Sequence, residues 1–177
     1  YRRDRVELHP LLDKPTILAG KFQAGDQVNI VPPKCTIDID VKYLPSETDE
    51  EGGGSRVKEQ LKKWVLDAAE QDAWMKEHPP RVEFLYDLPP SSTPPDHPIV
   101  ATIKSVHADL FGGREAKVIG FQAWSDMYHL NNCKIAAVMC GPGDMETSAH
   151  QIDEYVPVQE LVDATKLLCG VIVAWCN

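Results

Sequence analysis

The sequence lacks an excess of basic charge, a long hydrophobic run and a paired arrangement of cysteines. Its 18 lysines and arginines are outnumbered by 27 aspartates and glutamates, so the net charge is −9. No basic stripe is available to neutralise phosphates, which argues against a nucleic-acid partner. The longest apolar run, LLCGVIVAWC, is too short to span a bilayer, and the N-terminal YRRDRVELHP has no signal-peptide core. We therefore expect a cytoplasmic protein with no membrane-bound part.

Several catalytic motifs are also missing. The sequence contains no GxSxG, no phosphate-binding GxxxxGK loop, no HExxH and no GxGxxG. Its five cysteines are scattered, odd in number and without a CxxC pair. This usage favours reduced, buried thiols over a disulfide framework or a catalytic thiol. The cysteines are Cys35, Cys133, Cys140, Cys169 and Cys176.

The apolar content of 43% is that of a globular protein, and the first half alternates in a way typical of strands. Residues 15–25 and 35–43 predict two antiparallel, half-buried strands joined by a turn at Pro32–Pro33. Residues 55–78 carry apolar side chains at helical spacing, with Ser55 as the N-cap. Residues 81–87 alternate again and predict a third strand.

The second half is separated from the first by a proline-rich stretch, DLPPSSTPPDHP. Beyond it, helical and strand patterns alternate, as in an α/β layer with a mostly parallel sheet. Since two parallel strands rarely stand alone, we expect part of that sheet to come from outside this sequence. The predicted elements are a helix from 99 stopped by Gly112–Gly113, a strand at 116–123, a helix capped by Ser125, a strand at 134–140 and a helix at 157–176.

His150 is the first candidate for chemistry. It follows the apolar stretch 134–140 by a Gly-Pro-Gly loop, and loops after parallel strands converge on the crevice of α/β enzymes. A lone histidine is more often a polar loop residue, and zinc needs three or four ligands. From spacing alone, both a metal ligand and a surface histidine remain open.

Other candidate residues carry weaker signals. Ser125 and Asp126 lie at a strand-to-helix junction, where N-capping explains both and anion binding is the alternative. Asn29 in a turn and Lys42 at a strand end are explained equally well by a loop hydrogen bond and a solvated charge.

Three stretches in a fixed order are more specific in combination. They are HPLL…PTILAGKFQAGDQVNIVPPKCTIDIDVKYLP, FQAWSD and GPGDMETSAHQIDEYVPVQELVDATKL. Together they resemble the zinc-dependent amidohydrolases and peptidases grouped with acetylornithine deacetylase, succinyl-diaminopimelate desuccinylase, aminoacylase and carboxypeptidase G. The resemblance covers nearly the whole chain, and its last stretch is the strongest part.

The resemblance implies an α/β fold: part of a ferredoxin-like (α+β) lid domain, then the C-terminal part of an α/β catalytic domain with a mostly parallel sheet. The implied boundaries are an extended entry at 1–15, a ββαβ lid portion at 16–90, a proline-rich linker at 91–98 and the catalytic portion at 99–177. The lid often mediates dimerisation in such enzymes, so a homodimer is implied.

The resemblance also implies roles for individual residues. His150 matches the last metal-binding histidine of the family. Asn29 matches a lid asparagine, and Lys42 stands where many relatives carry an arginine for a substrate carboxylate. Since lysine is a point charge and not a bidentate fork, carboxylate recognition is expected to be looser. The remaining implied substrate-cleft positions are Trp124, Ser125, Asp126, Gly141 and Gly143.

The implied activity is metal-assisted hydrolysis of an amide bond in an N-acyl amino acid, a related small amide or a dipeptide. In the family, two zinc ions (with cobalt or manganese as substitutes) activate a water, and a glutamate moves its proton. The family's other metal ligands, this glutamate and the lid histidine find no match in the sequence. We therefore expect this chain alone to bind no metal and to be inactive. The alternative is a non-catalytic dimerisation or interaction module.

Overall fold

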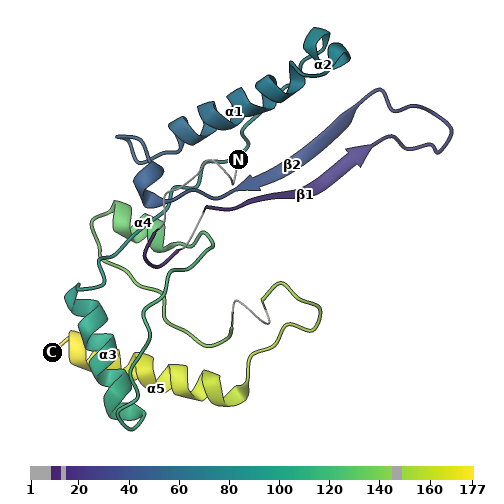
Figure 1. The fold of residues 1–177 in the computed structure, drawn as a ribbon. Coiled ribbons are helices and arrows are strands. Elements are labelled where there is room, and N and C mark those ends of the chain that lie inside the picture. The colour runs from purple at the N-terminus through teal and green to yellow at the C-terminus, as the bar shows by residue number, and fades with distance from the viewer. Residues whose placement is uncertain (1–8, 13–14, 145–148) are drawn as a thin grey trace. The chain divides into compact units, whose positions relative to one another are not determined.

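The computed structural model describes residues 9–12, 15–144 and 149–177 and divides the chain into two compact units. The first unit comprises Tyr1–Pro90 together with Ile119–Ser125, and the second comprises Ser91–Val118 together with Asp126–Asn177. Figure 1 labels the helices and strands of both.

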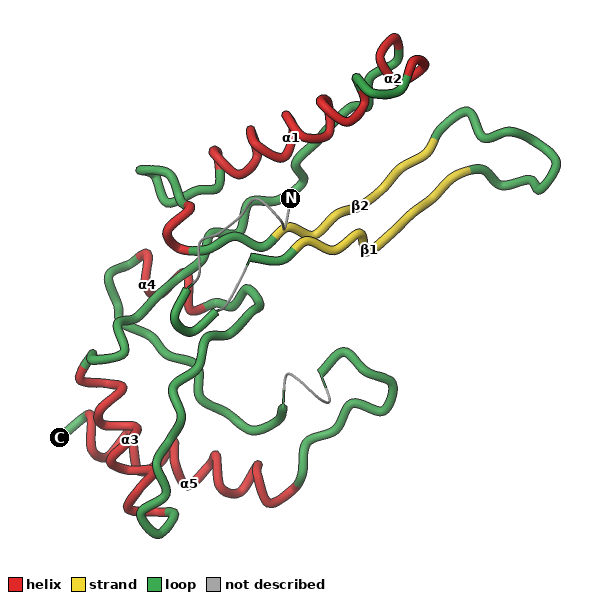
Figure 2. The backbone as a smooth tube through the Cα atoms, viewed as in Figure 1, coloured by secondary structure: helices red, strands yellow, loops and turns green. Residues whose placement is uncertain are grey.

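A two-stranded antiparallel ribbon dominates the first unit. Strand β1 (Ile17–Ala24) pairs with β2 (Cys35–Val41), from Ile17 opposite Val41 to Ala24 opposite Cys35. The register shifts between Ala19 and Lys21, so Gly20 is the extra residue of a bulge, a position where glycine is common. Figure 2 shows the ribbon and the long loop at its tip. The predicted antiparallel pairing is confirmed.

The ribbon is exposed on both faces, which corrects the prediction of half-buried strands. On β1, Leu18 is 63% and Phe22 68% exposed, and on β2, Ile37 and Ile39 are also classed as exposed. The alternation of Ile37 and Ile39 with Asp38 and Asp40 does separate two faces. Alternation reports which side chains share a face, but burial also needs a layer that covers that face.

The predicted helix at 55–78 is present but interrupted. It forms α1 (Ser55–Ala69) and α2 (Ala73–Glu77), and it ends before Pro79 as expected. The interruption arises because the Asp72 carboxylate accepts the backbone N–H groups of Trp74 and Met75 and so starts a new helix.

The start of α1 also differs from the prediction. Ser55 is the first helical residue and not the cap, and the N-cap Gly54 has no side chain to offer. The Asp49 carboxylate takes that role from six residues upstream, since it accepts the N–H groups of Gly53 and Ser55 at 2.7 and 3.1 Å. A short 3-10 helix, η1 (Pro45–Glu47), lies just before this turn.

A second carboxylate, Asp87, joins three separate parts of the first unit. It accepts a hydrogen bond of 2.7 Å from the Tyr43 hydroxyl, just after β2, and one of 3.1 Å from the Gly54 N–H. Its other partner is the Lys58 ammonium on α1, at 2.6 Å. We call Tyr43, Gly54, Lys58 and Asp87 the Asp87 clamp.

The second unit is built on two packed helices. Helix α3 (Pro98–Leu110) begins at the His97 cap and ends where Gly112 and Gly113 take positive φ, as predicted. Helix α5 (Val158–Trp175) packs against it (Figure 1). A Cβ added to Gly170 would come within 2.6 Å of a Val106 methyl, so glycine permits the close approach.

Helix α4 (Met127–Asn132) is short and lies between the two helices in sequence. Its N-cap is Asp126, so the prediction of Ser125 as cap is wrong by one residue. Asn131 on this helix donates hydrogen bonds to the Ser92 carbonyl and the Thr93 hydroxyl. These bonds attach α4 to the chain that enters the second unit.

Three predicted strands do not form in the part of the chain that is described. Residues 81–87, 116–123 and 134–140 have no ladder partner, and the described sheet contains β1 and β2 alone. A strand is stabilised by hydrogen bonds to its neighbour, so an alternating or apolar pattern cannot create one without that neighbour. The fold class that the structure shows is therefore a mixed α/β chain, and the ferredoxin-like lid and the parallel sheet stay predictions.

Few side chains are buried. Among the described residues, the buried apolar side chains are Leu44, Val57, Ala69, Val100 and Leu167. All five cysteines are reduced but exposed, which corrects the expectation of buried thiols. None of the described helices is long and apolar enough to cross a membrane. Many large apolar side chains are exposed, among them Phe22, Leu85 and Ile119.

The Asp87 clamp predicts the effect of adding a methyl group at Gly54. A Cβ there would lie 2.9 Å from the Tyr43 ring, which Asp87 holds in place. We expect Gly54→Ala to lower the free energy of unfolding by about 1–3 kcal/mol, because the added atom overpacks the clamp. Urea unfolding of both proteins measures this. The control is Gly20→Ala, where no atom lies within 4 Å of the new Cβ, and equal stability of the two variants would contradict the prediction.

The carboxylates of Asp49 and Asp87 predict that the folded chain loses stability in acid. Hydrogen bonds from Ser55 and from the Gly53 N–H lower the pKa of Asp49 to about 2. Partial burial alone would raise the pKa of Asp87, but the hydrogen bonds from Lys58, Tyr43 and Gly54 outweigh it and lower that pKa. Because both folded pKa values lie below the unfolded value of about 3.9, their stabilisation is complete above that value and is lost as the pH falls toward 2.

The urea midpoint measured between pH 7 and pH 2 tests this dependence. We expect Asp87→Asn, combined with Asp49→Asn, to flatten the decline below pH 4. Asp26→Asn, at an exposed position of the hairpin loop, is the control and should decline as the wild type does. A double variant that keeps the full acid dependence would show that these carboxylates do not cause it.

Candidate functional site

His150 lies in an exposed turn of the second unit, before α5. Its backbone has a positive φ of 59°, which is uncommon for a residue with a side chain, and Asp153 has a φ of 63°. The His150 N–H donates a hydrogen bond of 3.0 Å to the Glu154 carboxylate. Glu154 therefore contacts the backbone of His150 in this structure.

The Gly141–Pro142–Gly143 loop lies nearby in sequence and is also held by a glutamate. Gly143 has a φ of +94°, and a Cβ there would lie 3.5 Å from Val156. The Gly143 N–H donates a hydrogen bond of 3.0 Å to Glu160 in the first turn of α5. The loop that contains Gly141 is thus attached to the start of a long helix.

A metal ion needs more donors than the described residues bring together. No group of three or more histidine, cysteine, aspartate or glutamate side chains that could hold a metal ion occurs among residues 9–12, 15–144 and 149–177. One imidazole does not make a zinc site, since structural sites have four ligands and catalytic sites three. The donor set described in this chain does not fit a complete metal centre.

Trp124, Ser125 and Asp126 lie where the chain passes from the first unit to the second. The segment before them is anchored to the start of the chain, because Gln122 donates a 2.9 Å hydrogen bond to the Leu12 carbonyl. Asp126 makes no side-chain capping bond to α4, so N-capping does not account for its carboxylate. Trp124 is 39% exposed.

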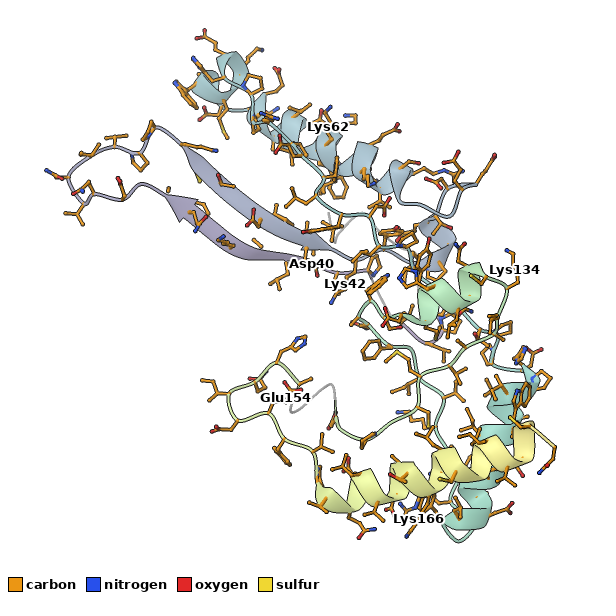
Figure 3. The ribbon with its side chains drawn as sticks, turned by 180° about the vertical axis from the view of Figure 1, so that it is seen from behind. Asp40, Lys42, Lys62, Lys134, Glu154 and Lys166 are labelled. Atoms are coloured by element: carbon orange, nitrogen blue, oxygen red, sulfur yellow. The ribbon has the colours of Figure 1, made fainter. Side chains whose placement is uncertain are left out.

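Asn29 and Lys42 lie at opposite ends of the ribbon in the first unit. Asn29 is exposed in the loop between β1 and β2, where Gly25 turns the chain with a φ of +66°. Lys42 directly follows β2, and its ammonium is 3.8 Å from the Asp40 carboxylate, with both side chains well exposed (Figure 3). Such an ion pair contributes little to stability and leaves the lysine accessible.

The predicted site residues are therefore divided between the two units. Asn29, Lys42, Trp124 and Ser125 belong to the first, and the second contains Asp126, Gly141, Gly143 and His150. Within the second unit, Gly143 and His150 share one feature, a backbone N–H bound by a glutamate. Sequence reasoning did not find Glu160. Nor did it find the bond from the His150 backbone N–H to Glu154.

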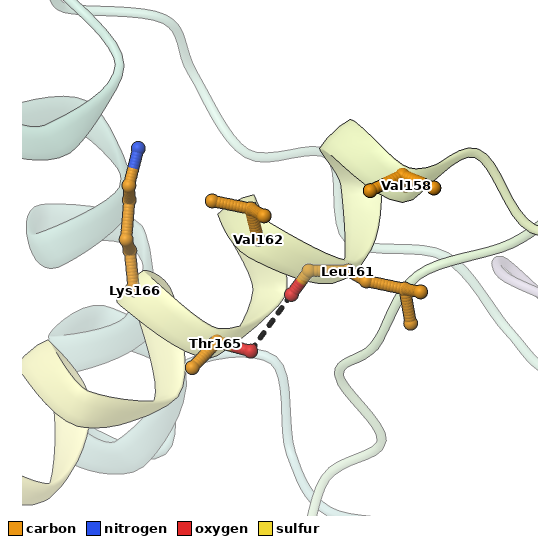
Figure 4. A pocket seen from close by; sticks show the side chains of 5 residues that line it. All are labelled: Val158, Leu161, Val162, Thr165 and Lys166. Atoms are coloured by element: carbon orange, nitrogen blue, oxygen red, sulfur yellow. Dashed lines mark hydrogen bonds between the residues drawn. The ribbon is translucent and has the colours of Figure 1, made fainter.

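A shallow depression on α5 was not predicted. It is lined by Val158, Leu161, Val162, Thr165 and Lys166, all from this one helix (Figure 4). The Thr165 hydroxyl donates to the Leu161 carbonyl at 2.8 Å, so its polar group is satisfied within the helix. The depression offers a mainly apolar face, in which Lys166 is the one charged side chain, and its lining contains no histidine, cysteine or carboxylate.

The sequence of this chain matches one protein-family model, that of peptidase family M20/M25/M40, over residues 4–174. The chain belongs to this family. This match confirms the resemblance that the three sequence stretches indicated.

Two curated relatives carry the same name, N-formyl-4-amino-5-aminomethyl-2-methylpyrimidine deformylase. The protein from Bacillus subtilis is 26% identical over 172 residues, and the one from Halalkalibacterium halodurans is 28% identical over 171 residues. Each alignment covers 92% of this chain and 38% of the relative. The chain thus spans less than two fifths of the length of these relatives.

This chain is also similar in fold to a solved structure of the same family. An M20 family metallo-carboxypeptidase from Sulfolobus solfataricus matches with a TM-score of 0.60 and 20% identity, covering 91% of this chain and 36% of that protein. At this identity the likeness concerns the fold alone. The chain is a family M20 polypeptide, and family membership supports amide-bond hydrolysis with a divalent metal at the level of the family.

Proposed function

We propose that this chain is the part of a metal-dependent amide hydrolase that supplies the last metal-binding histidine and part of a lid. The observation that carries the proposal is the family match over residues 4–174, which places His150 inside a family M20 sequence. Its exposed position supports the proposal, because a ligand must be accessible to a metal held with other residues.

The same geometry limits what the chain can do alone. Its described residues contain no further set of metal donors, so the remaining ligands and the general base would belong to the rest of a full-length protein. Zinc is the metal we propose, since imidazole is a good ligand for zinc, and cobalt and manganese are the proposed substitutes. We propose no catalysis by the 177 residues alone.

The substrate is proposed as a small molecule with an N-acyl or N-formyl amide, or a dipeptide. Both curated relatives are named for removing a formyl group from an aminopyrimidine, and that name contains no carboxylate. Lys42 fits this chemistry, because a single exposed ammonium recognises a carboxylate less specifically than a bidentate arginine does. Asn29, Trp124, Ser125, Asp126, Gly141 and Gly143 are the other proposed substrate-cleft residues.

The organisation of the full-length protein is part of the proposal. Residues 16–90 would contribute to a ferredoxin-like lid, residues 91–98 would form a linker and residues 99–177 would complete a catalytic domain with a parallel sheet. The exposed β1–β2 ribbon supports a homodimer formed through the lid, since an unpaired strand edge readily pairs with another chain. A cytoplasmic location agrees with the reduced cysteines.

A non-catalytic interaction module remains the second candidate. The observation in its favour is the same ribbon, whose large apolar side chains, such as Leu18 and Phe22, are exposed. Exposed apolar surface of this kind usually marks a contact with another polypeptide. The two functions differ in whether His150 contributes to metal binding, and that difference can be measured.

Zinc binding distinguishes these functions. We expect the 177-residue chain to bind zinc negligibly and to hydrolyse no N-formyl or N-acetyl amide, because a single imidazole is not a site. We expect the full-length protein to bind zinc, and His150→Ala to reduce that affinity at least tenfold, as measured by competition with a chelator. His129→Ala, at another exposed histidine, is the matched control and should bind zinc as the wild type does. Tight stoichiometric zinc in the short chain, or unchanged affinity in His150→Ala, would contradict the proposal.

Lys42 predicts a difference between substrate classes. We expect Lys42→Arg in the full-length protein to raise kcat/KM for N-acyl amino acids relative to a formylated aminopyrimidine, because arginine can bind a carboxylate with two parallel hydrogen bonds. A change of about tenfold in the ratio corresponds to one good charge-assisted hydrogen bond. Lys62→Arg on the exposed face of α1 is the control. An unchanged ratio would place Lys42 outside the substrate cleft.

A further inference from the structure

Two glutamates bind backbone N–H groups, one at His150 and one at Gly143. The proposed function assigns no role to either glutamate. The Glu154 carboxylate accepts the His150 N–H, and the Glu160 carboxylate accepts the Gly143 N–H, each at 3.0 Å. Glu154 lies on the segment that leads into α5 (Figure 3). We propose that Glu154 is a positioning residue that fixes the turn at His150 and thereby aims its imidazole, while Glu160 holds the backbone at Gly143 in the same way. This inference rests on the proposed function in one respect, the role of His150 as a ligand.

The backbone of the loop explains why such bonds are needed. Both His150 and Asp153 have positive φ, a conformation that crowds the Cβ of a residue other than glycine. Such a residue keeps this conformation only where surrounding contacts over-determine it. The His150 N–H donates to the side chain of Glu154, four residues later in the sequence. This bond closes the turn that contains His150 and Asp153.

The direction of the His150 side chain depends on this turn. Since φ and ψ set where the Cα–Cβ bond points, a His150 that relaxed to a negative φ would direct its ring elsewhere. Metal ligands must be held within a fraction of an ångström of their working position, and the residues that orient a ligand affect metal affinity strongly. Glu154 would therefore influence metal binding through His150, without contacting the metal.

Glu160 supports the backbone at Gly143. It lies in the first turn of α5, where a negative charge is favoured by the helix dipole. Its bond to Gly143 attaches the glycine loop to that helix. Glu154 thus holds the backbone N–H of His150 from within its own turn, and Glu160 holds that of Gly143 from the helix.

The test uses variants of the full-length, metal-free protein. It compares variants that remove the glutamate carboxylate with variants that keep an acceptor oxygen at the same position. Amide hydrogen exchange followed by NMR reports whether the His150 and Gly143 N–H groups are hydrogen-bonded. We expect Glu154→Ala to accelerate exchange at His150 about tenfold, and Glu160→Ala to do so at Gly143, since each loses a charge-assisted bond. Glu154→Gln and Glu160→Gln keep an acceptor oxygen and should remain within about threefold of the wild type. Gln151→Ala, in the same turn, is the control.

Zinc affinity, measured by chelator competition, is the second readout. We expect Glu154→Ala to weaken zinc binding about tenfold and Glu154→Gln to restore most of it. The inference is overturned if Glu154→Ala leaves exchange and affinity as in the wild type, or if Glu154→Gln is as damaging as Glu154→Ala. It is also overturned if His150→Ala loses zinc while Glu154→Ala does not, although the proposed function then stands. If His150→Ala leaves zinc affinity unchanged, the proposed function fails, and exchange still decides whether Glu154 shapes the loop.

Discussion

The first unit depends on the carboxylate of Asp87. Its two oxygens contact the Tyr43 hydroxyl beyond β2, the Gly54 N–H before α1 and the Lys58 ammonium on α1. Among the described residues of this unit, the buried apolar side chains are Leu44, Val57 and Ala69. The clamp joins the ribbon, the helix and the segment that leads into the proline-rich stretch. Because it is only partly exposed and has several donors, its contribution exceeds that of a surface ion pair.

The scarcity of buried apolar surface is the second constraint. Side chains such as Phe22, Ile119 and Ile172 are well exposed, and residues 116–123 and 134–140 have strand-like sequences without a described partner strand. Exposed apolar side chains and unpaired backbone both favour contact with further polypeptide. The proposed full-length enzyme supplies a reason for both, since this chain spans 38% of the length of its curated relatives.

Metal binding by His150, as proposed, would have one local and one global requirement. Its position in the turn is set locally, by a left-handed backbone and by a bond to a residue four positions later. Its capacity to hold a metal is a global property, since the other donors must converge on the same point from distant segments. The described chain satisfies the local requirement and contains no second set of donors. The turn at His150 is thus formed within this chain, whereas the proposed metal centre would need donors from the rest of a full-length protein.

The sequence by itself determined the elements whose stability is local. The alternation in CTIDIDV, together with the preceding strand-like stretch ILAGKFQA, predicted the antiparallel ribbon. Pro79 and Gly112–Gly113 predicted where helices end, and the order of three motifs predicted the family. Only the tertiary structure decided that Asp49 and not Ser55 caps α1 and that Asp72 interrupts the helix. It also decided that Glu154 holds the backbone at His150 and Glu160 that at Gly143. Each of these depends on which acceptor reaches a backbone N–H, a competition between side chains that residue periodicity does not record. Burial of the ribbon and formation of the further strands failed as predictions for a related reason, because both need a neighbouring layer that the sequence pattern of a single segment cannot supply.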